Sequence, residues 1–246
     1  MRLLLINPNT TDAMTNRMLE LGRALVEPGV ELTGVTGRFG ARYVASRASY
    51  AIAGHSALDC YAEHGQGVDA VLLACFGDPG LFALRELADC PVVGMAEASC
   101  ATAAERGRFS IVTGGERWGS MLEEFVASIG FSSQLAGVTT VAPTGADIAR
   151  DPKGSIALLA EACRHASQER AASSVILGGA GLAGLAGPVG EYAGVPVIDS
   201  FEALMKAGIA AASHPLRRPS TGPTAKTPPV ETIGLSSALT RSFGNA

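Results

Sequence analysis

Residues 71–80 read VLLACFGDPG, and this stretch decides the expected fold. Residues 70–74 suit a buried strand that runs into Cys75, and a glycine and a Pro-Gly pair then force a turn. Open α/β sheets present their chemistry in this way, because ligands bind outside the carboxyl ends of the strands. A second stretch, VILGGAGLAG at residues 175–184, has the same shape but carries Gly179 where the first carries Cys75.

Strands and helices alternate along the rest of the chain. Buried strands are expected at residues 3–6, 31–36, 70–74, 91–94, 109–112, 137–141, 174–177 and 195–198. Helices are expected at about residues 11–26, 51–64, 81–88, 97–105, 118–129, 155–168 and 202–212. The alternation predicts parallel sheets joined by helical crossovers, which is an α/β fold.

The two halves of the chain correspond at three strand ends. Asn7 aligns with Thr113, Cys75 with Gly179, and residues 90–98 with residues 195–203, at offsets of 104 to 106 residues. This internal duplication predicts two similar lobes, residues 1–96 and residues 97–212, each a parallel sheet flanked by helices. We expect a pseudo-two-fold axis between the lobes and the active site in the cleft where they meet.

The last segment, residues 213–246, is rich in Pro, Ser and Thr and cannot form a core of its own. We expect an extended tail that packs on the body of the protein or on a neighbouring subunit.

Composition and charge argue against several classes of function. A formal net charge of −4 without a long basic stretch argues against a nucleic-acid partner. No apolar run reaches the roughly 18 residues of a membrane span, and the N-terminal residues suit a strand better than a signal peptide. The five cysteines lack CxxC spacing, which predicts no disulfide framework, no zinc site and a cytoplasmic location.

Cys75 is the strongest catalytic candidate. A thiol at a strand end before a helix lies where partial positive charge lowers its pKa and favours the thiolate. The alternative is a buried core thiol. The other cysteines fit that simpler description: Cys60, Cys90, Cys100 and Cys163.

Residues 179–184 read GAGLAG, which matches the G-x-G-x-x-G pattern of dinucleotide-binding turns, and Asp199 follows 20 residues after Gly179. However, the motif comes late in the chain, and the helix expected next contains a glycine and a proline. We therefore expect no nicotinamide cofactor. The backbone N–H groups of Gly179, Ala180 and Gly181 suit an oxyanion or carboxylate instead.

Three turns offer further substrate-binding candidates. They contain Asn7, Pro8 and Asn9 after the first strand, Thr113 and Gly115 in a Thr-Gly-Gly turn, and Tyr43 in a loop at residues 42–50. The simpler alternatives are a turn with a helix cap and an ordinary surface loop. Asp78 is expected to be only a turn residue, and the histidines to lie on helix faces.

The wider set of motifs is INPNT (6–10), GARYVAS (40–46), ACFGDPG (74–80), PVVGMAEA (91–98), FSIVT (109–113), GAGLAGLA (179–186) and PVID (196–199). Together they resemble the aspartate/glutamate/hydantoin racemase superfamily, most of all its hydantoin and allantoin racemase branch. The resemblance covers nearly all of residues 1–212, and TIGLSSAL near the end is similar as well. It implies a two-lobed, cofactor-independent homo-oligomer that acts on a small-molecule substrate.

The resemblance also implies a mechanism. Such racemases place one cysteine on each lobe, on opposite faces of the substrate α-carbon, so that one thiolate removes a proton and the other thiol returns one. Backbone donors must stabilise the developing enolate. The matching positions here are the N–H groups of Phe76, Gly77, Gly115 and Ala180.

This chain departs from the family pattern at Gly179, where the second cysteine normally stands, because glycine carries no acid or base. Four explanations stay open. Water or another group replaces the second thiol, or the protein has moved to a different reaction, as in the related arylmalonate decarboxylases, which use one cysteine on the other lobe. Otherwise the protein only binds a ligand, or the sequence is a variant.

We expect an isomerase that acts at the carbon α to a carbonyl of a hydantoin, allantoin or amino-acid derivative, with Cys75 as the acid/base. The alternatives are a cofactor-free decarboxylase in which Cys75 is the single proton donor, and a non-catalytic small-molecule binder.

Overall fold

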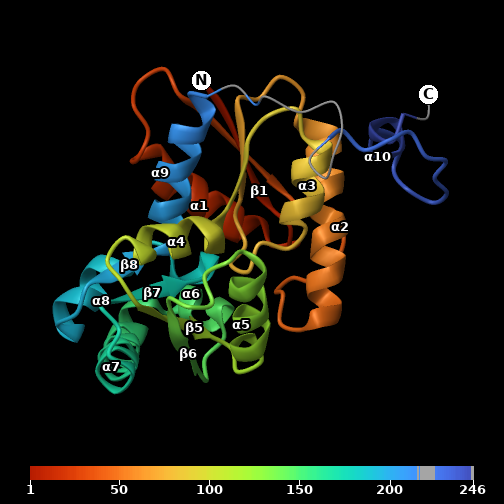
Figure 1. Ribbon diagram of the computed structural model, residues 1–246. Helices are drawn as coiled ribbons and strands as arrows, with labels where there is room; N and C mark the ends of the chain where they lie inside the picture. Colours follow the sequence, from red (N-terminus) through yellow and green to blue (C-terminus); the bar gives the residue numbers. More distant parts are fainter. Residues whose placement is uncertain (215, 217–224, 245–246) are drawn as a thin grey trace.

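Two four-stranded parallel sheets form the centres of two lobes (Figure 1). The computed structural model describes residues 1–214, 216 and 225–244. The strand order is β2-β1-β3-β4 in the first sheet and β6-β5-β7-β8 in the second, so the two sheets have the same topology. The predicted α/β fold with two similar halves is confirmed.

The elements of the first lobe follow one another as strand and helix. They are β1 (Arg2–Asn7), α1 (Asp12–Arg23), β2 (Glu31–Thr36), α2 (Arg47–His64), β3 (Ala70–Leu73), α3 (Leu81–Leu87), β4 (Val92–Gly94) and α4 (Met95–Ala104).

The second lobe repeats the pattern with two additional short helices. Its elements are β5 (Phe109–Gly114), α5 (Trp118–Ser128), β6 (Leu135–Val141), α6 (Gly145–Arg150), α7 (Pro152–Arg170), β7 (Ser174–Gly178), the 3-10 helix η1 (Ala180–Leu182), α8 (Ala186–Ala193), β8 (Val197–Asp199) and α9 (Ser200–Ala212).

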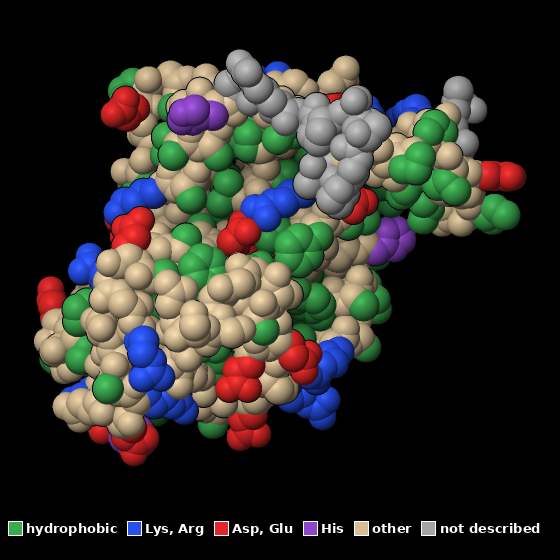
Figure 2. Space-filling model, in the orientation of Figure 1, with side chains coloured by type: hydrophobic (Ala, Val, Ile, Leu, Met, Phe, Trp, Pro, Cys, Tyr) green, Lys and Arg blue, Asp and Glu red, His purple; other side chains and the backbone are tan. Residues whose placement is uncertain are grey.

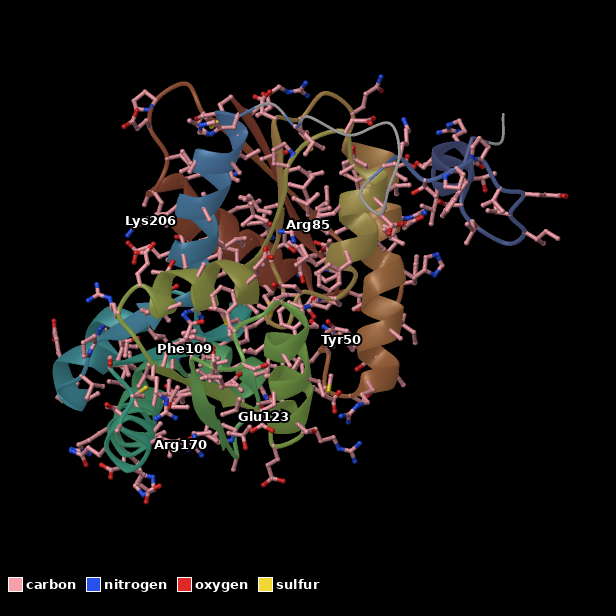
Figure 3. All side chains as sticks on the ribbon, viewed as in Figure 1. Tyr50, Arg85, Phe109, Glu123, Arg170 and Lys206 are labelled. Atoms are coloured by element: carbon pink, nitrogen blue, oxygen red, sulfur yellow. The ribbon has the colours of Figure 1, made fainter. Side chains whose placement is uncertain are left out.

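The central strands are apolar because helices cover both faces of each sheet. All four residues of β3 are buried, and so is Phe109 at the start of β5 (Figure 3). Parallel pairing places Ile6 beside Leu73 and Thr113 beside Gly178. Neighbouring strands therefore end together, and their carboxyl ends bring distant turns to one place in each lobe.

The last helix of each half crosses to the other lobe. Helix α4 follows the first sheet but packs against β7, and α9 follows the second sheet but packs against β3 and β4 (Figure 1). At Gly208, a Cβ atom would lie 1.9 Å from Leu72 Cδ2, so α9 approaches β3 more closely than a larger residue allows. This exchange fixes how the two lobes face each other.

Local capping explains where the helices differ from the prediction. Helix α2 begins at Arg47 rather than at residue 51, because the Ser46 and Ser49 side chains form a capping box at its start. Residues 47–50 are therefore helical, and the predicted loop at residues 42–50 is wrong for that part. A similar box between Thr144 and Asp147 starts α6, a helix that is not among those predicted.

The final helix, α10 (Ser237–Ser242), was also not predicted. It packs against α2 and buries Ala238 and Leu239. The predicted extended segment falls partly on residues 215, 217–224 and 245–246, which lie outside the described residues.

Charged side chains of both signs are interspersed on the face of the molecule shown in Figure 2. Within the described part of the chain, no helix is both long and apolar enough to cross a membrane.

Candidate active site

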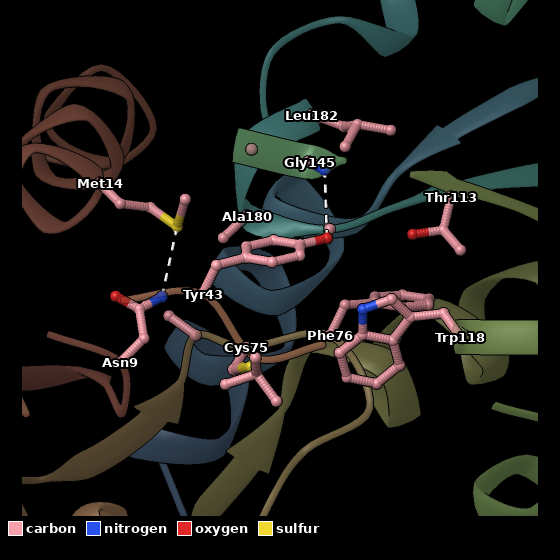
Figure 4. Close-up of a pocket in the computed structure, with 14 residues that line it drawn as sticks. Asn9, Met14, Tyr43, Cys75, Phe76, Thr113, Trp118, Gly145, Ala180 and Leu182 are labelled. Carbon is pink, nitrogen blue, oxygen red and sulfur yellow. Dashed lines mark hydrogen bonds between the residues drawn. The ribbon is translucent and has the colours of Figure 1, made fainter. Parts of the chain in front are cut away.

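A cavity of about 40 Å³ lies where the strand ends of the two lobes meet (Figure 4). The first lobe contributes Asn9, Met14, Tyr43, Cys75 and Phe76 to its wall. The second contributes Thr113, Trp118, Gly179, Ala180 and Gly181, together with Gly145 and Leu182. The structure thus brings eight of the residues selected from the sequence to one pocket: Asn9, Tyr43, Cys75, Phe76, Thr113, Gly179, Ala180 and Gly181.

Cys75 follows the end of β3 and is 8% exposed. Burial, reinforced by the negative charge of Asp78, raises the pKa of the Cys75 thiol to about 12. The expectation of a lowered pKa is therefore wrong. The physical reason is that burial outweighs any helix effect, and the helix expected to follow directly, α3, begins only at Leu81, after a turn.

Asp78 does more than form the predicted turn. Its buried carboxylate accepts hydrogen bonds from the N–H groups of Ala96 and Glu97, both at 2.8 Å, at the start of α4. Its own N–H donates to the Cys75 carbonyl at 2.9 Å. Burial raises the pKa of Asp78 to about 7. This residue ties the Cys75 turn to the helix that crosses between the lobes.

Arg85 supports the same junction (Figure 3). Its guanidinium donates from Nε to the Val92 carbonyl at 3.2 Å and from Nη1 to Glu97 at 2.9 Å. The start of α4 is therefore held from two sides, by Asp78 at its backbone and by Arg85 at its first acidic side chain.

Gly179 lies at the matching position of the second lobe. Its φ of 137° and ψ of 140° belong to a region that essentially only glycine adopts. A Cβ atom here would lie 3.2 Å from Leu182 Cδ1 and 3.8 Å from Thr113 Oγ1, two residues of the pocket wall. A side chain at Gly179 would therefore point into the pocket, at the cost of backbone strain.

Tyr43 closes the pocket from the loop before α2. Its hydroxyl accepts a hydrogen bond from Gly145 N–H at 3.1 Å and donates to the Gly114 carbonyl at 3.3 Å (Figure 4). The Tyr43 pKa is raised, chiefly by burial. Thr11 Oγ1 donates to the Arg42 carbonyl at 2.7 Å, so the loop is anchored on the first lobe while its tyrosine docks on the second.

Within the Asn-Pro-Asn turn, one asparagine stabilises the turn and the other lines the pocket. Asn7 is fully buried and donates from Nδ2 to Asn9 Oδ1 and to Thr15 Oγ1, both at 3.0 Å. It shapes the turn and, like Pro8, does not line the pocket. Asn9 does line it, and its Nδ2 lies 3.5 Å from Met14 Sδ, which is a weak acceptor (Figure 4).

Two of the proposed backbone donors have other roles. Gly115 N–H already donates to the Val141 carbonyl at 3.0 Å, and neither Gly77 nor Gly115 lines the pocket. A Cβ at Gly77 would lie 2.9 Å from the Trp118 ring, so this glycine makes room for the ring. The N–H groups of Phe76 and Ala180 remain, and neither has an acceptor among the residues described.

Sequence reasoning missed several wall residues: Met14, Trp118, Gly145 and Leu182. Trp118 follows the Thr-Gly-Gly turn and is the single tryptophan of the chain, which could have drawn attention to it. Gly145 belongs to α6 and reaches the site only through tertiary packing against the glycine-rich turn. The two segments are so close that a Cβ atom at Gly181 would lie 2.1 Å from the carbonyl oxygen of Gly145.

Asp199 has a structural role that needs no nucleotide. Its carboxylate accepts from the N–H groups of Phe201 and Glu202 at 2.9 and 3.1 Å, which caps α9. It also accepts from Gly184 N–H at 2.7 Å, which holds the glycine-rich turn. The carboxylate that a dinucleotide motif would use to bind a ribose is thus already hydrogen-bonded to the backbone of this protein.

The described wall of the pocket contains no His, Asp, Glu, Lys or Arg. No group of three or more His, Cys, Asp or Glu side chains among the described residues is arranged to hold a metal ion. Cys75 and Tyr43 are therefore the ionisable groups of the described wall.

Comparison with known proteins gives a consistent result. The family model for Asp/Glu/Hydantoin racemase matches residues 3–208. A hydantoin racemase from Pseudomonas sp. (strain NS671) is 35% identical over 208 residues, which is 84% of each chain.

Solved structures agree. The crystal structure of allantoin racemase from Pseudomonas fluorescens is 30% identical, has a TM-score of 0.90 and covers 95% of this chain and 100% of that one. A glycine-to-cysteine, cysteine-to-serine double mutant of arylmalonate decarboxylase shares the fold at 17% identity, with a TM-score of 0.63 and coverage of 91% and 98%. The chain therefore belongs to the Asp/Glu/hydantoin racemase family and is an isomerase of the racemase type.

Proposed function

We propose that this protein transfers a proton at the carbon α to a carbonyl of a hydantoin- or allantoin-type ring, with Cys75 as the acid/base. The observation that carries the proposal is the place of Cys75, in an otherwise uncharged pocket between the two lobes. The likeness to a hydantoin racemase and to an allantoin racemase supports the substrate class.

The uncharged pocket favours a ring over a free amino acid. A free amino acid brings a carboxylate, and no cationic side chain is present in the described wall to pair with it. A cyclic ureide brings carbonyl oxygens, which accept hydrogen bonds. The N–H groups of Phe76 and Ala180 are the candidates to stabilise the enolate that forms when Cys75 removes the α-proton.

Proton transfer is expected to favour one face of the substrate. Gly179 offers no proton donor, and the hydroxyl nearest to its absent side chain, Thr113 Oγ1, already donates to the Gly178 carbonyl at 2.7 Å. Reprotonation of the opposite face then depends on a neutral hydroxyl or on water. Both are weaker acids than a cysteine thiol, so inversion should be slower than proton exchange.

The second candidate function is cofactor-free decarboxylation of a disubstituted malonate. It is favoured by the burial of Cys75 in the pocket wall, which raises the pKa of the thiol and keeps it protonated at neutral pH. In that reaction the C–C bond to the leaving carboxylate breaks, CO2 departs, and the electron pair remains as an enediolate. The Cys75 thiol then gives its proton to carbon and recovers one from water.

The two functions separate in one experiment. Single enantiomers of 5-substituted hydantoins and allantoin are incubated with the protein in D2O, and α-deuteration is followed by ¹H NMR against an enzyme-free sample. We expect deuteration of a hydantoin or allantoin and no CO2 from an arylmalonate. CO2 release without deuteration would replace the first proposal by the second, and no reaction with either substrate would contradict both.

The pH dependence offers a further prediction. Because the Cys75 pKa is raised to about 12, its thiolate fraction increases with pH through the neutral range, by less than tenfold per unit near pH 7, where Asp78 also loses its proton. Removal of an α-proton needs the thiolate, so kcat/KM for exchange should increase with pH from about 6 to 8. Decarboxylation needs the thiol and should stay level. An exchange rate that decreases over this range would contradict Cys75 as the base.

A further inference from the structure

A second cavity adjoins the candidate active site. Met14, Tyr43, Ala180 and Gly181 line both cavities, so the Tyr43 side chain stands between them. We call the outer cavity, of about 420 Å³, the vestibule. Its own wall includes Arg17 of α1, Arg42 of the Tyr43 loop, and Ala146, Ala149 and Arg150 of α6.

The vestibule carries the charge that the inner pocket lacks. Three arginines line it, and no acidic residue is part of its described wall. Arg150 is paired with Asp147 on its own helix, so the positive charge that the vestibule offers comes from Arg17 and Arg42.

Neither of these two arginines is neutralised by a described carboxylate. The Arg17 guanidinium donates to the Ala149 carbonyl at 3.3 Å and to the Ala183 carbonyl at 3.1 Å, and both acceptors are uncharged. Arg42 is exposed, and within residues 1–214, 216 and 225–244 its side chain forms no ion pair. Two positive charges therefore face a cavity that adjoins an uncharged pocket.

We propose that the vestibule binds an anionic substituent of the substrate, a carboxylate on a short chain, while the uncharged ring occupies the inner pocket. This inference rests on the proposed function. Guanidinium groups pair with carboxylates through two parallel hydrogen bonds, and the pairing is stronger where water is partly excluded. The chain between ring and carboxylate would pass Tyr43, so the substituent has to be flexible.

The test uses two substrates that differ only in charge: hydantoin-5-propionic acid and its carboxamide. Their shapes are almost the same, but the acid is ionised at neutral pH. We measure kcat/KM for α-deuteration of each by ¹H NMR at low ionic strength. The acid should be preferred by about tenfold, and added salt should reduce that preference because it screens exposed charges.

Arg42→Gln provides the matching variant. Loss of one exposed ion pair is worth up to about fivefold, so the acid-to-amide ratio should decrease by about that factor. Arg106→Gln is the control with the same change of net charge. Arg106 is exposed and lies just before the amino end of β5, whereas the pocket lies at the carboxyl ends of the strands. The Arg106→Gln variant should therefore keep the wild-type acid-to-amide ratio.

The outcomes are distinguishable. Equal kcat/KM values for acid and amide, unaffected by salt, would overturn the vestibule proposal and leave the proposed function intact. An equal decrease in the ratio with Arg106→Gln would overturn it too, because the preference would then come from overall charge. If neither compound is deuterated while other 5-substituted hydantoins are, the vestibule proposal alone is overturned; if no hydantoin is deuterated, the proposed function is contradicted, and this inference with it.

Discussion

Cys75→Ala is expected to reduce α-proton exchange by about a thousandfold, the typical contribution of a positioned acid/base group. Cys75 is the one thiol in the described wall of the pocket, and the other ionisable group there, Tyr43, has a raised pKa. No described side chain is therefore placed to replace the lost base. The measurement is deuteration of a single hydantoin enantiomer in D2O, with the folded state checked by thermal melting.

Two matched variants make this result specific. Cys75→Ser keeps the size of the side chain but replaces the thiol by a much weaker acid, so it should lose nearly as much activity. Cys163→Ala removes a buried thiol in α7 that does not line the pocket, and it should leave exchange unchanged. Full activity of Cys75→Ala would remove the basis of the proposed site.

Gly179→Cys is expected to have two opposing effects. It places a thiol on the face of the pocket that belongs to the second lobe, so the rate of inversion relative to exchange should increase at least about tenfold. It also imposes a side chain on a backbone with φ of 137°, which should reduce stability by about 1–3 kcal/mol. Chiral chromatography measures the inversion, and urea denaturation measures the stability.

Gly179→Ala separates the two effects, because it carries the same backbone strain without a thiol. It should lose a similar amount of stability and gain no inversion. If the cysteine and alanine variants invert the substrate at the same rate, the residue at position 179 does not face the reacting carbon.

The sheets could be predicted from the sequence because their central strands are buried on both faces. Such strands give continuous apolar runs, and the runs at β1, β3, β5 and β7 were all recognised. The turns that follow them carried the candidates, and parallel pairing explains why Asn9, Cys75, Thr113 and Gly179 meet at one pocket.

The rest of the site depends on contacts between residues far apart in the chain. Gly145 and Leu182 come together only because α6 packs on η1, and no local sequence pattern predicts that contact. The pKa of Cys75 was mispredicted for a related reason, since burial is a property of the whole fold. Asp78 seemed an ordinary turn residue because the helix that it caps begins 17 residues later.

The ratio of α-deuteration to inversion for the wild-type protein tests the central claim most directly. A single hydantoin enantiomer is incubated in D2O, deuterium is measured by NMR and configuration by chiral chromatography, and the enzyme-free rates are subtracted. If Cys75 acts as a lone acid/base from one face, deuteration should exceed inversion by about tenfold or more while the substrate keeps its configuration. Inversion that matches deuteration from the first time points would contradict this account, because it requires a second proton donor opposite Cys75.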